Sequence, residues 1–367
     1  MAEHLVVDSR HLNPVVAELG SMGLKAESVE RVDRLDLARL TFPDLRAYRA
    51  AALPEHVNEL LAKRGTLKRI SALDVLLMDL RTRFAREHGH VPALDDDAEA
   101  AVGLPQHKTI PVKPTPVADA PPSTAKEGDG DGVVVAVVDT PVYPDAFDGT
   151  VTGNQHAEPT GTVMSVHGTF VSALVKRFAP RAEIVVAGAL GDEDETRTAW
   201  DVAATMSERF ADRRPAIVNM SLGVANDEPE PPLALRRVLD RLGDGVLVVA
   251  AAGNRQNLDD PPAEIWPAAM TSVCAVGSAT GDFSMRRPWV DLVAPGEHVV
   301  STWVPQVELR RGATGFAAWS GTSFAAPQVT GAVAALMSRN GGMTAQEALE
   351  LLPGHPDWPV FGYIHGA

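Results

Sequence analysis

The sequence is poor in cysteine and in positive charge, and it lacks any long apolar run. Its single cysteine, Cys274, cannot form an internal disulfide. The formal net charge of −15 disfavours nucleic acid and anionic membranes as partners, because both repel an acidic surface. No apolar run approaches the roughly 20 residues that span a bilayer, and no basic segment followed by an apolar one marks a signal peptide. These absences predict a cytoplasmic protein that binds neither nucleic acid nor membrane.

The first region, residues 1–103, is predicted to form a small α+β unit within a chain long enough for one large domain and a smaller one. Leu5–Val7 is typical of a strand, residues 14–20 of a helix, and residues 35–42 of a half-buried strand. Residues 55–64 and 72–88 place Leu, Val and Ile at helical spacing. No reactive cluster is evident. Five scattered histidines are expected at the surface: His4, His11, His56, His88 and His90.

Residues 104–131 differ from their flanks in composition. Six prolines precede a stretch of alternating glycine and acidic residues that begins at Glu127. Proline blocks regular structure and the glycines loosen the chain after it, so this segment is predicted to be an extended, mobile linker.

Apolar runs alternate with helical patterns over residues 132–367. Unbroken runs rich in Val and Ala suit parallel strands that are covered on both faces. The predicted strands lie at 133–138, 182–190, 216–223, 245–254 and 271–277, and the predicted helices at 167–175, 199–210, 233–242 and beyond Gly321 to Leu336. This alternation predicts an α/β fold, a parallel sheet with helices on both faces. Cys274 falls in one strand and is interpreted as a small core residue.

Four polar residues lie at predicted strand ends or helix starts: Asp139, His167, Asn254 and Ser323. Taken singly, each has a structural interpretation, for example a cap for Asp139 or an N-cap for Ser323. In a parallel α/β sheet, however, such positions meet at one edge, where ligands bind. Ser323 would also lie beside the unpaired N–H groups of a helix start, which suits a nucleophile whose product carries an oxyanion. His156 lies in a polar loop and is interpreted as a bystander.

The motifs around these residues resemble the signature blocks of subtilisin-like serine proteases. In chain order they are Asp139-Thr140, His167-Gly168-Thr169, Asn219-Met220-Ser221-Leu222-Gly223, Ala250-Ala251-Ala252-Gly253-Asn254, Val293-Ala294-Pro295-Gly296 and Gly321-Thr322-Ser323-Phe324-Ala325-Ala326-Pro327. The order Asp, His, Ser is that of subtilisin. The resemblance covers about residues 131–367 and implies a subtilisin-like peptidase domain there.

The resemblance implies a serine endopeptidase that works through an acyl-enzyme intermediate. Ser323 would be the nucleophile, His167 the general base and then acid, and Asp139 the residue that orients the imidazole. Asn254 would donate its side-chain amide to the oxyanion. The reaction needs no cofactor, and no Asp/Asn cluster matches a metal site of the family, so none is predicted.

The resemblance also implies that a protein or peptide substrate binds as an extended strand. Ser221, Leu222 and Gly223 would form one wall of the substrate cleft. The substrate-binding residues would also include Ala252, Gly253 and Ile265. Ile265 falls where relatives often have something smaller at the base of the primary specificity pocket, which implies a shallow pocket for small or medium apolar side chains.

Two further positions bear on the comparison with the family. Pro141 stands where the family usually has glycine, so the turn after Asp139 is expected to differ, without loss of activity because Asp139 and Thr140 are intact. The acidic loop at 192–195 falls near the second strand that flanks the substrate and would favour basic residues further from the cut.

Two interpretations of residues 1–130 remain open. They are either a propeptide that assists folding, inhibits the enzyme intramolecularly and is cut away, or a permanent regulatory domain. The competing function is a catalytically silent peptide-binding module with the same fold. A metal hydrolase would need ligand spacing such as His-Glu-x-x-His, and an α/β-hydrolase would need Gly-x-Ser-x-Gly, and neither pattern occurs.

Overall fold

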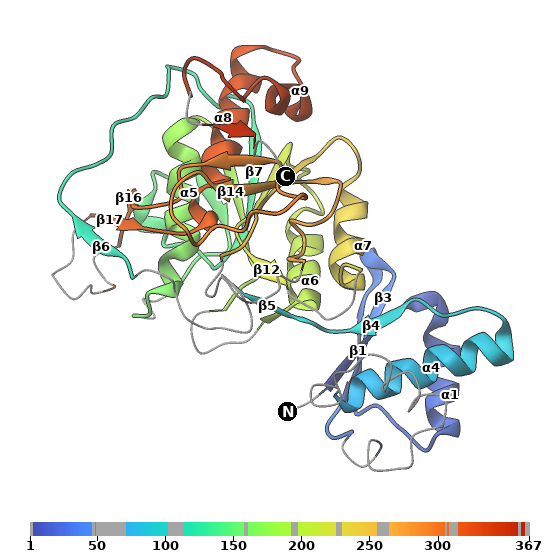
Figure 1. Ribbon diagram of the computed structural model, residues 1–367. Coiled ribbons are helices and arrows are strands. Elements are labelled where there is room, and N and C mark those ends of the chain that lie inside the picture. Colours follow the sequence, from blue (N-terminus) through green and yellow to red (C-terminus); the bar gives the residue numbers. More distant parts are fainter. Residues whose placement is uncertain are drawn as a thin grey trace. The chain divides into compact units, whose positions relative to one another are not determined.

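The computed structural model describes residues 3–45, 48, 71–101, 113–157, 161–191, 197–224, 230–254, 264–304, 307, 315–358 and 361–363 (Figure 1). The chain forms two compact units. Unit 1 comprises Met1–Ala98 with Pro232–Val238, and unit 2 comprises Glu99–Pro231 with Leu239–Ala367. The helix predicted at 55–64 and the acidic loop at 192–195 lie outside the described residues.

Unit 1 is a small α+β structure. Its described strands form an antiparallel sheet in the order β2-β3-β1-β4, with β1 at Glu3–Asp8, β2 at Ser28–Val32, β3 at Leu37–Phe42 and β4 at Leu94–Asp96. Helices α1 (Leu12–Ser21) and α4 (Ala72–His88) share one hydrophobic core with the sheet. The predicted strand at 35–42 begins two residues later, because Asp33–Leu35 form a 3₁₀ turn that ends in left-handed Asp36.

Local sequence signals set the ends of α4. The Ser71 side chain accepts from the Asp74 backbone N–H while Asp74 accepts from that of Ser71, a capping box that satisfies two orphan donors. Gly89, with a φ of 70°, ends the helix in the left-handed conformation. The predicted bounds of this helix are therefore the observed ones.

The start of helix α7 (Leu233–Leu242) belongs to unit 1. The Leu233 backbone N–H donates to Asp95 at 3.2 Å, and the Arg237 guanidinium pairs with Asp8 at 2.7 Å. Hydrogen bonds from Arg10 and then Arg237 hold the pKa of the buried Asp8 carboxyl far below its usual value.

Unit 2 contains a mostly parallel sheet of eight strands among its described residues. Their order is β18-β15-β14-β13-β11-β7-β9-β8, and only the β15–β18 pair is antiparallel. The strands are β7 (Val134–Asp139), β8 (Val151–Gly153), β9 (Glu183–Gly188), β11 (Ile217–Met220), β13 (Leu247–Ala251), β14 (Val273–Ser278), β15 (Leu292–Ala294) and β18 (Gly362–Tyr363). The predicted α/β fold is confirmed. Buried Cys274 lies in β14, as expected.

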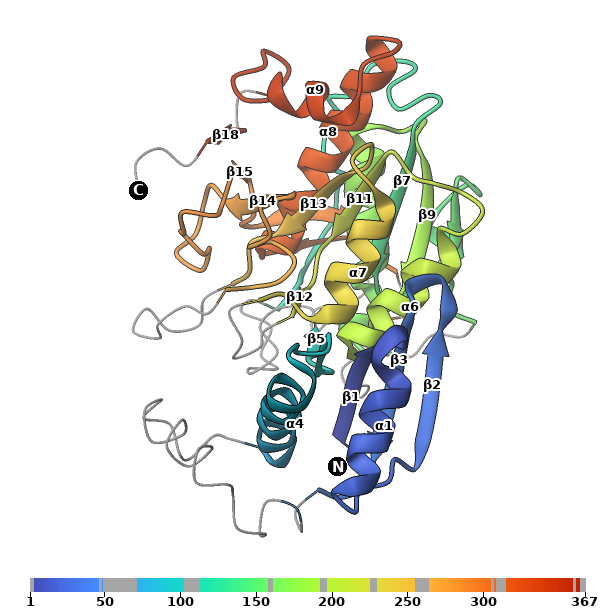
Figure 2. The same cartoon turned by 90° about the vertical axis from the view of Figure 1, so that its right-hand side faces the viewer.

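Helices cover both faces of this sheet. Val135 and Val137 of β7 pack in one cluster with α5 (His167–Phe178) and α8 (Ala326–Arg339), and the alternate residues Ala136 and Val138 are equally buried. Helix α6 (Ala199–Arg209) lies on the face opposite α8 (Figure 2). Helices α5 and α8 approach closely because Gly331 has no side chain, since a Cβ there would lie 2.7 Å from the Val175 carbonyl oxygen.

The topology places the end of β7 at a switch point. After β7 the chain adds β9 on one side of β7, and the later strands β11 and β13 are added on the other side. Crevices form outside the carboxyl ends of strands where the crossovers diverge in this way. Asp139, the last residue of β7, lies at that point.

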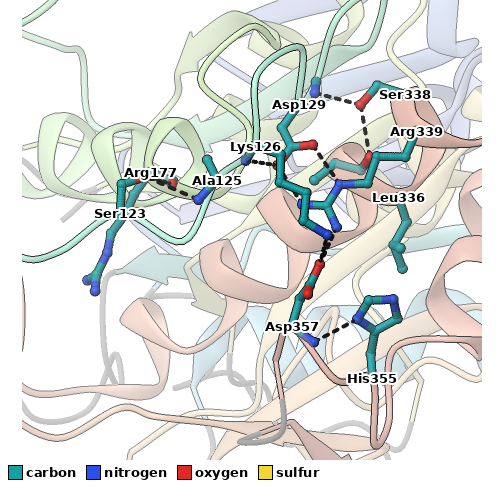
Figure 3. Close-up of polar contacts among 12 residues, drawn as sticks. Ser123, Ala125, Lys126, Asp129, Arg177, Leu336, Ser338, Arg339, His355 and Asp357 are labelled. Atoms are coloured by element: carbon teal, nitrogen blue, oxygen red, sulfur yellow. Dashed lines mark hydrogen bonds and ion pairs between the residues drawn. The ribbon is translucent and has the colours of Figure 1, made fainter.

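The predicted linker at 104–131 is corrected over its described part. β6 (Thr115–Val117) pairs with β17 (Phe316–Trp319), which also pairs with β16 (Val299–Thr302). Figure 3 shows Asp129 bound to Arg339 at the end of α8, and Asp357 bound to both Arg339 and Lys126. Proline and glycine predicted mobility here, but these long-range charge pairs fix the segment within unit 2.

Unit 2 also contains a small three-stranded sheet that joins β10 (Arg197–Thr198), β5 (Glu99–Ala101) and β12 (Gly223–Val224).

Among the described helices, including the short α9 (Ala345–Glu350), none combines the length and apolar character needed to span a membrane.

Candidate active site

Asp139 and His167 form a buried pair at the carboxyl end of β7, an internal strand of the main sheet. His167 Nδ1 lies 2.8 Å from Asp139 Oδ1, and the same oxygen accepts from the Thr140 backbone N–H at 2.7 Å. Both side chains are at most 1% exposed. Asp139 Oδ2 and His167 Nε2 are also buried and have no hydrogen-bond partner among the described residues. One imidazole nitrogen is therefore held by the carboxylate, and the other is available for a reacting group.

Gly168 lets the start of α5 approach the turn after β7. A Cβ at this position would lie 2.1 Å from the Thr140 carbonyl oxygen, so any other residue would push the helix away. The Gly168 backbone N–H also donates to Thr140 Oγ1 at 2.9 Å. The His-Gly-Thr motif thus fixes His167 against the strand that carries Asp139.

Ser323 lies in a 3₁₀ turn, Thr322–Phe324, that precedes α8. The sequence predicted a turn led by glycine that opens the helix, with Ser323 in the first helical turn, and the structure places Ser323 in the 3₁₀ turn just before α8. Its hydroxyl donates to the Ser221 carbonyl oxygen at 3.4 Å, and the Ser221 hydroxyl donates to the Ser323 carbonyl oxygen at 2.8 Å. These reciprocal bonds join the turn to the end of β11.

Asn254 follows β13 and faces the same turn. Its side-chain oxygen accepts from the Thr322 backbone N–H at 2.9 Å and lies 3.1 Å from Thr322 Oγ1. Thr322 Oγ1 in turn accepts from the Gly253 backbone N–H at 3.1 Å. Because its oxygen is engaged on this side, the amide nitrogen and its two hydrogens point to the other side.

Sequence reasoning missed the polar contacts that hold this region together. Asn219 Nδ2 donates to Ser221 Oγ at 2.9 Å, and Thr330 of α8 donates to Asn219 Oδ1 at 3.1 Å. These residues stand in the signature motifs or directly after them, and that is the signal that could have found them. Together with Thr322, they link β11, β13 and the Ser323 turn into one hydrogen-bonded network.

Of the predicted substrate-binding residues, Ser221 and Gly253 belong to this network through their hydrogen bonds. Gly223 begins β12, which pairs antiparallel with β5 of the same chain, Gly223 opposite Ala101. Ile265 is 2% exposed and packs with Ala252, Met285 and Val290. A Cβ on Gly253 would lie 3.3 Å from Ile265 Cγ1, so Ile265 fills the space beside that glycine.

The remaining predictions concern Pro141, His156 and metal ions. Pro141 packs beside Gly188, and both contacts of the Asp139-Thr140 turn remain in place. His156 stacks on Tyr143 and bonds to the Ser165 carbonyl oxygen, as a structural residue does. In the part of the chain that the structure describes, His, Cys, Asp and Glu side chains form no group of three suited to a metal.

Comparisons with known proteins identify the family of the chain. Residues 130–352 match the Subtilase family, Peptidase S8. The chain is 31% identical to the major intracellular serine protease of Bacillus subtilis over 247 residues, which cover 60% of this chain and 73% of that protein. It is 29% identical over 237 residues to the intracellular serine protease of Paenibacillus polymyxa, which cover 58% of this chain and 69% of the relative.

The fold agrees with solved structures as well. The protease domain of PatA aligns with a TM-score of 0.51 and 28% identity, covering 62% of this chain and 88% of that domain. A lanthipeptide protease aligns with a TM-score of 0.51 at 22% identity, covering 60% of this chain and 78% of that one. The family match, the relatives and the α/β fold together place the chain in the subtilase family, as a subtilisin-like serine endopeptidase.

Proposed function

We propose that Ser323, His167 and Asp139 form the catalytic triad of this endopeptidase. The observation that carries the proposal is the buried 2.8 Å contact between His167 Nδ1 and Asp139 Oδ1, which leaves Nε2 as the nitrogen that can accept a proton. Ser323 supports it by lying in the turn before α8 that the family motif marks. The Ser323 hydroxyl must rotate from the Ser221 carbonyl toward Nε2 when substrate binds, since catalytic hydrogen bonds often tighten only then.

The chemistry then proceeds in two halves. Ser323 Oγ attacks the scissile carbonyl carbon while His167 Nε2 takes its proton, and the Asp139 carboxylate stabilises the imidazolium. Collapse of the tetrahedral intermediate breaks the C–N bond, and His167 returns the proton to the leaving amine. Water, activated by the same imidazole, then hydrolyses the acyl-enzyme.

Asn254 would stabilise the oxyanion of the tetrahedral intermediate, with the Ser323 backbone N–H as second donor. Its orientation supports this role, because the contacts of its oxygen with Thr322 turn the amide hydrogens away from that residue. Asn254→Leu should lower kcat by about 10²–10³, the magnitude known for an oxyanion-hole asparagine in subtilisin itself. A rise in KM of similar size with kcat unchanged would assign Asn254 to substrate binding instead.

The strand β12 would pair with an extended substrate, and the chain's own β5 supports this assignment. Glu99–Ala101 lie as the middle strand between β10 and β12. A foreign peptide that adds to β12 must displace β5, so residues 1–130 would inhibit the enzyme intramolecularly. Ala100→Pro, which removes a backbone donor from the middle strand, should raise hydrolysis of added peptide several-fold in the full chain. Unchanged hydrolysis would contradict the inhibition.

The primary specificity pocket would be shallow. Ile265 fills the space beside Gly253, and Met285 and Val290 pack behind it. We expect small or medium apolar side chains before the cut, and a peptide library dominated by large aromatic or basic residues would refute this. The acidic loop at 192–195, which lies outside the described residues, remains the proposed source of a preference for basic residues further away.

The protein would act in the cytoplasm. Two relatives are intracellular serine proteases by name, and the chain has a single cysteine. Fractionation of cells that produce the tagged chain tests this location. Hydrolysis of unfolded casein by the full chain, together with its loss in Ser323→Ala at unchanged thermal stability, tests the activity.

A further inference from the structure

Two aromatic rings pack against the same side of the His167 imidazole. The Trp319 ring lies 5.6 Å from it, centre to centre, at an interplanar angle of 81°, and the Phe324 ring lies at 5.3 Å and 41°. The two rings also contact each other at 5.0 Å. They come from either side of the proposed nucleophile, Trp319 from the end of β17 and Phe324 from the residue after Ser323.

These rings are themselves held in place. Phe170, one turn along α5 from His167, meets Trp319 at 5.7 Å and Phe324 at 4.7 Å. Trp303 meets Trp319 from another side at 6.0 Å, and its indole N–H donates to the Val307 carbonyl oxygen at 2.8 Å. All four aromatic side chains are at most 2% exposed. The surroundings of His167 are therefore a packed aromatic cluster with little freedom to rearrange.

A single hydrogen bond, from Nδ1 to Asp139, orients the imidazole in this structure, and Nε2 has no partner among the described residues. One hydrogen bond allows a ring to swing about the bonded atom, and such a swing would move Nε2 away from the nucleophile. The two rings pack against the imidazole and against each other, and they block a swing toward them, because a large rotation in that direction would bring the rings into a clash.

We propose that Trp319 is a positioning residue for His167 and that, with Phe324, it keeps Nε2 directed to the position from which it removes the Ser323 proton. The inference rests on the proposed triad. Trp319 acts through His167, so its loss should slow the chemical step more than it weakens substrate binding. Misplacement of a catalytic group by about 1 Å can cost about 10²-fold in rate.

The test compares Trp319→Leu, Trp319→Phe and Trp303→Leu in the full chain. Trp303→Leu is the matched control, because it removes an equally buried indole of the same cluster that contacts the Trp319 ring rather than the imidazole. With a peptide substrate, Trp319→Leu should lower kcat at least about tenfold with KM within about twofold. Trp319→Phe and Trp303→Leu should keep kcat within about threefold.

A spectroscopic measurement on the same variants needs no turnover. The His167 Nδ1 proton, bonded to a buried carboxylate, should give a proton resonance far downfield of the amide region in wild type and Trp303→Leu. It should broaden or disappear in Trp319→Leu, because a loosened ring exchanges this proton with water. His167→Ala identifies the signal.

The outcomes separate this inference from the proposed function. An equal drop in kcat for Trp303→Leu, an intact resonance in Trp319→Leu, or a rise in KM alone would overturn the positioning role. Wild type could hydrolyse no peptide and still show the His167 resonance, with Trp319→Leu as the one tryptophan variant that loses it. That result would refute the proposed catalytic function and support the positioning of His167 by Trp319.

Discussion

A charge cluster at the far end of α8 should contribute strongly to the stability of unit 2. Asp129 is fully buried and accepts two hydrogen bonds from Arg339, at 2.7 and 2.6 Å, and one from the Lys126 backbone N–H at 2.6 Å. Arg339 also pairs with Asp357 at 2.6 Å (Figure 3). Its guanidinium lies 4.9 Å from the centre of the Trp358 ring. The cluster joins the segment before β7 to the helix that follows Ser323.

Asp129→Ala should therefore destabilise the protein substantially. Removing one partner of a buried ion pair costs about 3–5 kcal/mol, and because Arg339 retains Asp357 we expect the lower end, about 3 kcal/mol. For a domain of this size that loss corresponds to a fall in Tm of about 6–12 °C. Asp129→Leu combined with Arg339→Met should recover most of the loss, because a buried pair replaced as a whole is often neutral.

Calorimetric unfolding of the full chain in a Ser323→Ala background, which prevents self-cleavage, measures both effects. Glu183→Gln is the matched control, because the Glu183–Arg213 pair is exposed and should contribute less than about 1 kcal/mol. A fall of less than about 2 °C for Asp129→Ala, or a double variant no more stable than the single one, would refute the reasoning.

Three further predictions concern other parts of the chain. Burial and then the neighbouring Asp95 raise the pKa of Asp96 to about 7. The folded state therefore binds more protons than the unfolded state between about pH 4 and 7, and unit 1 should lose stability as pH rises through that window. Urea unfolding at pH 5 and 8 should show this loss in wild type and not in Asp96→Asn. Ile265→Gly should extend cleavage to large aromatic residues in a peptide library, and a profile identical to wild type would count against the pocket assignment. Gly168→Ala should lower activity at least about tenfold, because its Cβ would clash with the Thr140 carbonyl; a variant with wild-type hydrolysis would show that α5 can shift without harm.

Much of the fold could be predicted because its signals are local. The unbroken apolar strands of the main sheet, the capping box of α4 and Gly89 after it are readable within a few residues. β2 was not predicted, because its residues are mostly exposed and show no buried face. Over its described part, residues 113–131, the mobile linker was a wrong prediction, since the Arg339 partner of Asp129 lies at the other end of the sequence, where no local pattern reveals it.

The features of the candidate active site also divide into those with a local sequence signal and those that depend on distant contacts. The signature motifs predicted Asp139, His167, Asn254 and Ser323 as site residues, and the structure brings Asp139 to His167 and Asn254 to the Ser323 turn. The contact between His167 and Trp319 could not be predicted, because Trp319 lies outside the signature motifs. Whether the Trp319 ring meets the imidazole depends on how β17 pairs with β16 and packs on α5, and that is a property of the folded chain.

Covalent labelling with a fluorophosphonate probe tests the central claim most directly, because only an activated serine reacts. The full chain should be labelled at Ser323, identified by mass spectrometry of the modified peptide. Ser323→Ala should not react, and His167→Ala should react at least about 10²-fold more slowly. Folded wild-type protein that binds peptide and remains unlabelled, with or without Ala100→Pro, would contradict the account and favour a catalytically silent peptide-binding module.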